Sequence, residues 1–212
     1  MIRNGVKKFI FSSTAAVFGN PKVVPIDEEA EKEPINPYGE AKYFFERVIK
    51  RYAHAYELKY TIFRYFNACG ATEQSKEDHA QESHLIPLVF QAVKGQRPSI
   101  AIFGTDYETP DGTCIRDYVH VSDLIDAHLL AIQKMESSPA NEFNLGNGNG
   151  YSVKEVIAAV EKVTGKVVPV TLAERRAGDP ARLVASSQKA KSELGCNPKY
   201  PEIEQIIRSA WE

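Results

Sequence analysis

Two short apolar segments on either side of a long amphipathic one constrain the fold of this chain most strongly. Residues 6–12 and 60–66 are nearly continuous apolar runs, as expected for strands covered on both faces of a parallel sheet. Between them, Asn36 is a suitable N-cap and Pro37 a suitable first residue for a helix. Apolar side chains then recur at steps of three and four, at Phe44, Phe45, Val48, Ile49, Tyr52 and Tyr56. This order predicts a βαβ unit with a right-handed crossover and therefore an α/β fold.

The rest of the sequence predicts shorter elements around a turn-rich loop. Ser152 and Glu155 have the spacing of a capping box, and the helix that they begin is expected to end near Gly165. The other expected elements are helices over residues 83–94, 121–135 and from 186 onward, strands over 99–103, 142–145 and 166–172, and a loop over 105–113.

Composition and charge argue against several classes of protein. The formal net charge of the 212 residues is −2, whereas nucleic-acid-binding domains usually carry a basic excess. No apolar run approaches the ~20 residues that span a bilayer, and the polar residues 12–14 interrupt the only stretch that resembles a secretion signal. Cys69, Cys114 and Cys196 are an odd number without a C-x-x-C pair, which indicates reduced thiols. We expect a cytoplasmic protein that binds neither nucleic acid nor membrane.

A tyrosine and a lysine four positions apart open the predicted long helix. Positions i and i+4 share a helix face, so Tyr38 and Lys42 are expected to be neighbours. A free phenol loses its proton only near pH 10, and a nearby ammonium stabilises the phenolate that acts as a base. The hydroxyls of residues 12–14 follow the first strand at its carboxyl end, where doubly wound sheets bind ligands. Although the pair alone is common on exposed helices, the combination predicts an acid/base site for coupled proton and hydride transfer.

No metal site is predicted. Asp117, His120 and Asp123 have a spacing typical of ligands, but apolar residues alternate with them where a strand is expected to join a helix. His79 and His84 lie in a loop, and His84 is better interpreted as a hydrogen-bond partner of a substrate.

Seven segments of the chain carry a resemblance to one family. They are residues 9–19 (FIFSSTAAVFG), 64–67 (RYFN), 102–104 (IFG), 111–113 (DGT), 116–121 (RDYVHV), 144–146 (NLG) and 175–179 (RRAGD). In this order they resemble the UDP-glucose 4-epimerases, within the extended short-chain dehydrogenase/reductase superfamily. Sugar-nucleotide dehydratases of that superfamily carry an acidic residue just after the hydroxyl, where this chain has Ala15 and Ala16, so a dehydratase is disfavoured.

The resemblance implies a role for each candidate residue. Tyr38, as phenolate, would take the proton of the sugar 4-hydroxyl, Thr14 would bind the same oxygen, and Lys42 would hold the ribose of NAD. Cofactor positions are matched by Ser12, Ser13, Tyr38, Lys42 and Tyr65, and substrate positions by Asn67, His84, Leu85, Phe103, Arg116, Arg176, Asp179 and Leu183. Of these, Arg116 and Arg176 suit a diphosphate, because a guanidinium matches phosphate oxygens.

The implied activity is the interconversion of UDP-galactose and UDP-glucose, in galactose metabolism, through a transient 4-keto sugar whose hydride passes to and from NAD. A homodimer of the full-length protein is also implied. Two alternatives stay open: a 4-epimerase of UDP-N-acetylglucosamine or another UDP-sugar, and a nucleotide-sugar-binding remnant without catalysis. Leu183 matches a position that lines the sugar pocket, and its size leaves acceptance of an acetamido group open.

Members of the family begin with a strand, a glycine-rich turn and a helix that hold the NAD pyrophosphate, and this chain has no counterpart of them. Residues 146–150 (GNGNG) lack the third glycine of the dinucleotide-binding pattern and are interpreted as a tight turn. We therefore expect an N-terminally truncated fragment, inactive alone. Its expected fold is the C-terminal part of a Rossmann-type doubly wound parallel sheet (1–69 and 117–146) plus a small mixed α/β UDP-sugar-binding domain (70–116 and 147–212).

Overall fold

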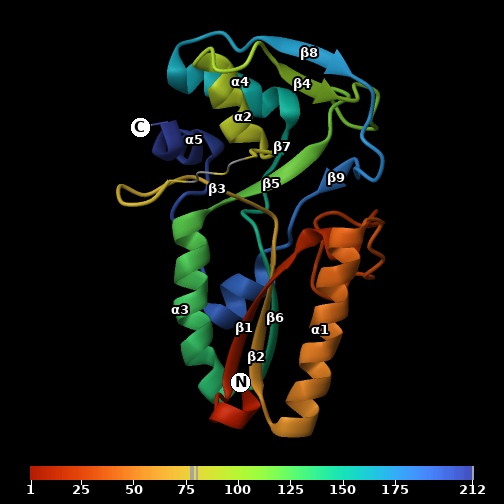
Figure 1. Ribbon diagram of the computed structural model, residues 1–212, viewed down its shortest axis with the longest axis vertical. Coiled ribbons are helices and arrows are strands. Elements are labelled where there is room, and N and C mark those ends of the chain that lie inside the picture. The colour runs from red at the N-terminus through yellow and green to blue at the C-terminus, as the bar shows by residue number, and fades with distance from the viewer. Residues whose placement is uncertain (77–78, 80, 212) are drawn as a thin grey trace.

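The computed structural model describes residues 1–76, 79 and 81–211 and contains a parallel three-stranded sheet at one end (Figure 1). The strand order is β1 (Lys8–Thr14), β2 (Lys59–Tyr65), β6 (Ala140–Leu145). The register aligns Thr14, Tyr65 and Leu145 at the carboxyl edge. This edge faces the part of the molecule that contains β5 (Figure 1). Residues that follow β1 and β2 in the chain therefore lie near the candidate functional site.

Two helices cover the opposite faces of this sheet, α1 (Pro37–Tyr56) on one side and α3 (Val121–Ser137) on the other (Figure 1). On the α1 side, Ile49 packs with Ile62 of β2. On the α3 side, Phe63 of β2 packs with residues of α3, including Leu124. Successive residues of β2 therefore enter different cores, which explains why the strand is an uninterrupted apolar run. None of the described helices is both long and apolar enough to cross a bilayer.

The second part of the molecule is built around strand β5 (Ile115–His120), which pairs with three other strands. It runs parallel to β3 (Asn67–Cys69) and β9 (Arg182–Leu183) and antiparallel to β7 (Gly150–Ser152). A separate parallel pair joins β4 (Ile100–Phe103) to β8 (Val170–Ala173). Helices α2 (Leu85–Val93), α4 (Val153–Thr164) and α5 (Ile203–Trp211) share one apolar core with these strands. The short helices are η1 (Ile2–Asn4), η2 (Ala15–Phe18) and η3, a π-helix (Ala190–Leu194).

The predicted α/β class and βαβ unit are confirmed. Asn36 caps α1 by accepting the backbone N–H of Gly39 at 2.8 Å. The capping box of Ser152 and Glu155 is present at the start of α4, and Gly165 ends that helix with a positive φ. The division of the chain into two domains at the stated boundaries stays a prediction.

The expectation of one helix from residue 186 onward is wrong. Residues 188–194, which include η3, and α5 are helical there, and residues 195–202 between them are not. Gly195 adopts φ 71°, which ends η3, and Pro198 and Pro201 follow without a backbone N–H to donate. The strand expected over 166–172 lies at β8 instead, after Pro169.

Candidate functional site

Seven of the eight predicted substrate residues line a single cavity of about 290 Å³. They come from β3, from the start of α2, from β4 and β5, and from the segment after β8: Asn67, His84, Leu85, Phe103, Arg116, Arg176 and Asp179. The eighth, Leu183, lines a smaller cavity of about 130 Å³ together with Thr14 and Tyr65. Asn67 and Arg116 line both cavities, so the two spaces adjoin there.

The larger cavity combines two guanidinium groups with an aromatic face. Arg116 is mostly buried and donates to Pro180 O at 2.8 Å and to Asp179 Oδ1 at 3.3 Å. The guanidinium carbon of Arg176 lies 3.9 Å from the ring centroid of Phe103. Two guanidinium cations attract phosphate oxygens, and an aromatic ring offers a stacking surface for a planar base. The cavity is therefore suited to a nucleoside diphosphate.

The smaller cavity lies where β1 and β2 end, beside the first residues of η2. Thr14 is the last residue of β1, and its hydroxyl accepts the N–H of Ala16 at 3.1 Å. The first turn of α1 approaches this segment closely, because a Cβ on Gly39 would lie 2.6 Å from the carbonyl oxygen of Ala16. Glycine at this position therefore allows the Tyr38 turn to pack beside the strand end.

Tyr38 and Lys42 share a face of α1, as predicted. The Lys42 Nζ atom lies 5.8 Å from the ring centroid of Tyr38 and donates to the carbonyl oxygen of Ser12 at 2.7 Å. Tyr38 is 58% exposed and lines neither cavity. The phenol is thus accessible from solvent, while the ammonium is fixed against the strand that carries Thr14.

A chain of hydrogen bonds runs from Ser12 of β1 through Tyr65 of β2 to His128 of α3. The Ser12 hydroxyl lies 2.9 Å from the Tyr65 hydroxyl, which lies 2.9 Å from Nε2 of His128. Nδ1 of His128 faces the carbonyl oxygen of Leu124 at 2.7 Å. Since a carbonyl only accepts, Nδ1 of His128 carries a proton. The sequence analysis missed His128, which lies within a helix and belongs to no motif.

The side chain of Ser13 points toward Glu46 of α1, while its role as a cofactor contact stays a prediction. Successive residues of a strand point to opposite faces, and Ser13 is buried between Ser12 and Thr14 in β1. Its hydroxyl donates to Glu46 Oε1 at 2.5 Å. We therefore assign the Ser13 side chain a structural role.

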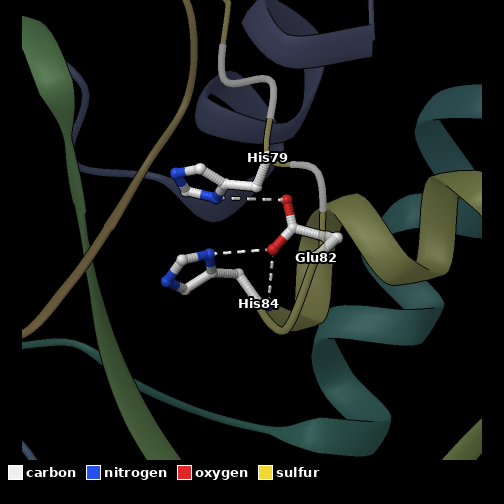
Figure 2. A group of neighbouring side chains, drawn as sticks. All are labelled: His79, Glu82 and His84. Carbon is white, nitrogen blue, oxygen red and sulfur yellow. Dashed lines mark hydrogen bonds and ion pairs between the residues drawn. The ribbon is translucent and has the colours of Figure 1, made fainter.

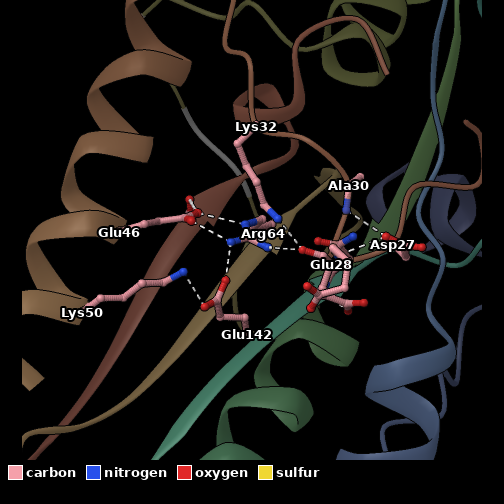
Figure 3. A network of polar contacts seen from close by, with 11 residues as sticks. Asp27, Glu28, Ala30, Lys32, Glu46, Lys50, Arg64 and Glu142 are labelled. Atoms are coloured by element: carbon pink, nitrogen blue, oxygen red, sulfur yellow. Dashed lines mark hydrogen bonds and ion pairs between the residues drawn. The ribbon is translucent and has the colours of Figure 1, made fainter. Parts of the chain in front are cut away.

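Glu46 belongs to a buried ionic network that ties α1 to all three strands of the parallel sheet (Figure 3). Arg64 of β2 donates from Nε and Nη2 to the two carboxylate oxygens of Glu46, at 3.0 and 2.7 Å, and neither side chain is exposed. Arg64 also donates to Glu142 of β6 at 2.5 Å, and Lys50 of α1 pairs with the other oxygen of Glu142. Burial alone would lower the pKa of Arg64, but the two carboxylates outweigh this effect and raise it.

Asp117 follows Arg116 in β5 and is fully buried. Its carboxylate accepts three backbone N–H groups, from Asn147 at 2.9 Å, Gly148 at 2.9 Å and Ala185 at 3.0 Å. A Cβ on Gly146 would lie 2.4 Å from Asp117 Oδ2, so this approach requires glycine. The GNGNG segment is thus a turn whose N–H groups are used within the protein, consistent with its sequence-based interpretation.

The burial of Asp117 leads to a prediction about pH. Burial raises the pKa of Asp117 from 3.8 to about 6, against the opposing effect of its three N–H partners. The folded state then holds the proton more tightly than the unfolded state, so the free energy of unfolding falls as pH rises from about 4 to about 6. Loss of the Asp117 proton lowers the free energy of unfolding by up to about 3 kcal/mol over this interval.

Urea unfolding of the wild type and of Asp117→Asn at several pH values between 4 and 7 measures this effect. The variant has no proton to release, and its single amide oxygen can still accept from Gly148 and Ala185, whereas its NH₂ group would then face the N–H of Asn147. We expect the stability of the wild type relative to the variant to fall across this interval. A constant or rising difference would contradict the prediction.

His120 and Asp123, which share the ligand-like spacing with Asp117, also have structural roles. Nε2 of His120 lies 2.9 Å from the Ser209 hydroxyl, and its Nδ1 accepts the N–H of Ser122 at 3.0 Å. Asp123 accepts the N–H groups of Lys199 at 2.8 Å and Tyr200 at 3.2 Å. These contacts tie β5 and α3 to the C-terminal segment.

Comparison with known proteins shows which family the chain is similar to. A sequence model of the NAD dependent epimerase/dehydratase family matches residues 1–146. A UDP-glucose 4-epimerase of Halalkalibacterium halodurans is 51% identical over 214 residues, which cover 100% of this chain and 64% of that protein. The Brucella ovis UDP-glucose 4-epimerase in complex with NAD has a TM-score of 0.95 at 43% identity, covering 99% of this chain and 66% of that one. The Bifidobacterium longum enzyme in complex with NAD+ and UDP has a TM-score of 0.94 at 39% identity, covering 99% and 64%. The chain thus spans about two thirds of the length of these relatives.

Proposed function

The chain belongs to the NAD dependent epimerase/dehydratase family, and on this premise we propose that it supplies the acid/base and substrate-binding residues of a UDP-glucose 4-epimerase. One observation carries the proposal. The cavity with two guanidiniums adjoins, at Asn67 and Arg116, the smaller cavity that is lined by the hydroxyl-bearing Thr14. A UDP-sugar needs this arrangement, with the diphosphate on cations and the sugar beside an acid/base group.

The contacts of the larger cavity support a mode of binding for UDP. Arg116 and Arg176 would pair with the diphosphate, and the carboxylate of Asp179 would accept hydrogen bonds from ribose hydroxyls. The aromatic face of Phe103 would stack on the uracil once Arg176 turns toward the phosphates. Leu183 would then lie beside the sugar, in the adjoining cavity.

The hydrogen-bond donors at the carboxyl end of β1 suit the nicotinamide and ribose of NAD. The Lys42 ammonium and the hydroxyls of Ser12 and Tyr65 are grouped at the carboxyl edge of the sheet. An ammonium and hydroxyls are the groups that bind ribose hydroxyls and a carboxamide. Bound NAD would accept the hydride from the sugar carbon and return it.

Tyr38 would act as the base that takes the proton from the sugar 4-hydroxyl, and Thr14 would orient the same oxygen. The alternative phenol, Tyr65, is less suited to this role. Its burial raises the pKa of Tyr65, against the effect of the Ser12 hydrogen bond, and therefore disfavours the phenolate. Lys42, fixed on Ser12 O, would stabilise the Tyr38 phenolate.

A chimeric enzyme tests the proposal. The N-terminal third of the Halalkalibacterium halodurans relative, fused in front of this chain, would complete the length of the relatives. We expect the chimera to interconvert UDP-galactose and UDP-glucose when NAD is bound. A folded chimera that binds both NAD and UDP without interconverting the sugars would contradict the proposed activity.

A further inference from the structure

Two imidazoles and a carboxylate converge ahead of α2, outside the proposed acid/base site. Figure 2 shows the rings of His79 and His84 one above the other, each with a nitrogen toward the Glu82 carboxylate. His84 Nδ1 lies 2.9 Å from Glu82 Oε1, and His79 Nδ1 lies 3.7 Å from Glu82 Oε2. One ligand atom from each residue lies within 4.8 Å of the others, and within the described part of the chain no other three His, Cys, Asp or Glu side chains gather in this way.

These separations suit a bound transition metal. Zinc binds imidazole nitrogen and carboxylate oxygen at about 2.0–2.1 Å, so neighbouring ligands of a tetrahedral ion are about 3.3 Å apart. The two nitrogen–oxygen separations, 2.9 and 3.7 Å, fall on either side of that value. The two histidines face different oxygens of the same carboxylate, and a rearrangement of the side chains within this 4.8 Å cluster would bring all three residues to one ion.

The carboxylate is held in place by the backbone, which favours such a site. Glu82 Oε1 accepts the N–H groups of Ser83 and His84, both at 2.7 Å, and the side chain is only 6% exposed. Hydrogen bonds of this kind orient metal ligands and increase affinity. The histidine side chains are 50% and 54% exposed, so water has access to the remaining coordination positions.

We propose that His79, Glu82 and His84 form a binding site for a divalent transition metal of the zinc class, with water completing the coordination. Two nitrogen ligands select such ions over magnesium and calcium, which prefer oxygen. The sequence pattern offers the two histidines without a third ligand, and Glu82 is the residue that the fold adds. Because His84 also lines the larger cavity, a bound ion would hold this ring at the rim of the proposed nucleotide site.

Zinc titration of the 212-residue chain by isothermal calorimetry tests the proposal. We expect one saturable zinc site per chain, and at least tenfold weaker binding after His79→Ala or His84→Ala. Glu82→Gln is expected to weaken binding to a lesser extent, because the amide oxygen still coordinates. The control is His54→Ala, which removes an exposed histidine from α1 and is expected to leave zinc affinity unchanged.

Cobalt gives a second readout, because a bound Co²⁺ ion coordinated by imidazole absorbs visible light. We expect this absorption in the wild type and its loss in the double variant His79→Ala/His84→Ala, whose folding is checked by circular dichroism. Absence of saturable zinc binding, or zinc binding by the folded double variant equal to that of the wild type, would overturn the proposal. The titration requires neither NAD nor a sugar nucleotide, so its failure is distinguishable from a failure of the proposed epimerase function.

Discussion

Replacing Tyr38 by phenylalanine is expected to lower the rate of UDP-galactose conversion by the chimeric enzyme about 10²–10⁴-fold. The substitution removes only the hydroxyl that would take the proton from the sugar. Tyr38 is 58% exposed and lines neither cavity, so folding and UDP affinity are expected to stay unchanged. The effect should therefore appear in kcat, measured by a coupled assay for UDP-glucose, while the Kd for UDP is constant.

Tyr52→Phe is the matched control for this experiment. Tyr52 lies on the same helix and is 49% exposed, but it is about four turns from the start of the helix. Its hydroxyl has no place in the proposed reaction, so wild-type turnover is expected. Wild-type turnover by Tyr38→Phe itself would refute the assignment of the base.

Replacing Glu46 by glutamine is expected to lower the free energy of unfolding by about 3 kcal/mol or more. The amide has nearly the same shape as the carboxylate but carries no charge, and its NH₂ group would face a donor of Arg64. The guanidinium is fully buried and bound to both oxygens of Glu46, so water does not compensate for the lost partner. Urea unfolding followed by circular dichroism measures the change.

Glu40→Gln provides the control, because Glu40 lies in the same helix and is exposed. Its effect is expected to stay within about 0.5 kcal/mol. If Glu46→Gln were as mild as Glu40→Gln, the network would not be a major source of stability for this sheet. Such a result would also weaken the view that the network fixes α1 against β1.

The elements that could be predicted from sequence are those with strong local signals. The apolar runs of β1 and β2 and the caps at Asn36 and Ser152 determine structure through neighbours in the chain. Strands β3, β7 and β9 are only two or three residues long, and they exist because β5 offers them a partner. Their residues carry no periodic pattern, so only the tertiary structure reveals them.

The residues of the candidate site likewise fall into those that a motif marks and those that only the fold reveals. Motifs located seven residues that the fold brings to one cavity, although they lie as far apart as Asn67 and Asp179. A run of three hydroxyl-bearing residues does not show which way each side chain points, and the fold directs the Ser13 hydroxyl to Glu46. His128 and Glu46 were missed for a related reason. Each acts through a partner distant in the sequence, Tyr65 and Arg64 respectively, and neither belongs to a recognisable motif.

The pairing of β5 with β3, β7 and β9 has a consequence for the kinetics of folding. These strands join parts of the chain that are far apart, from Asn67 to Leu183, so the loops between them must close before the pairing forms. Contacts of such long range slow folding, whereas the βαβ unit of β1, α1 and β2 forms from a continuous stretch. The nucleotide cavity would therefore be completed late, and recovery of UDP binding during refolding would time the last step of assembly.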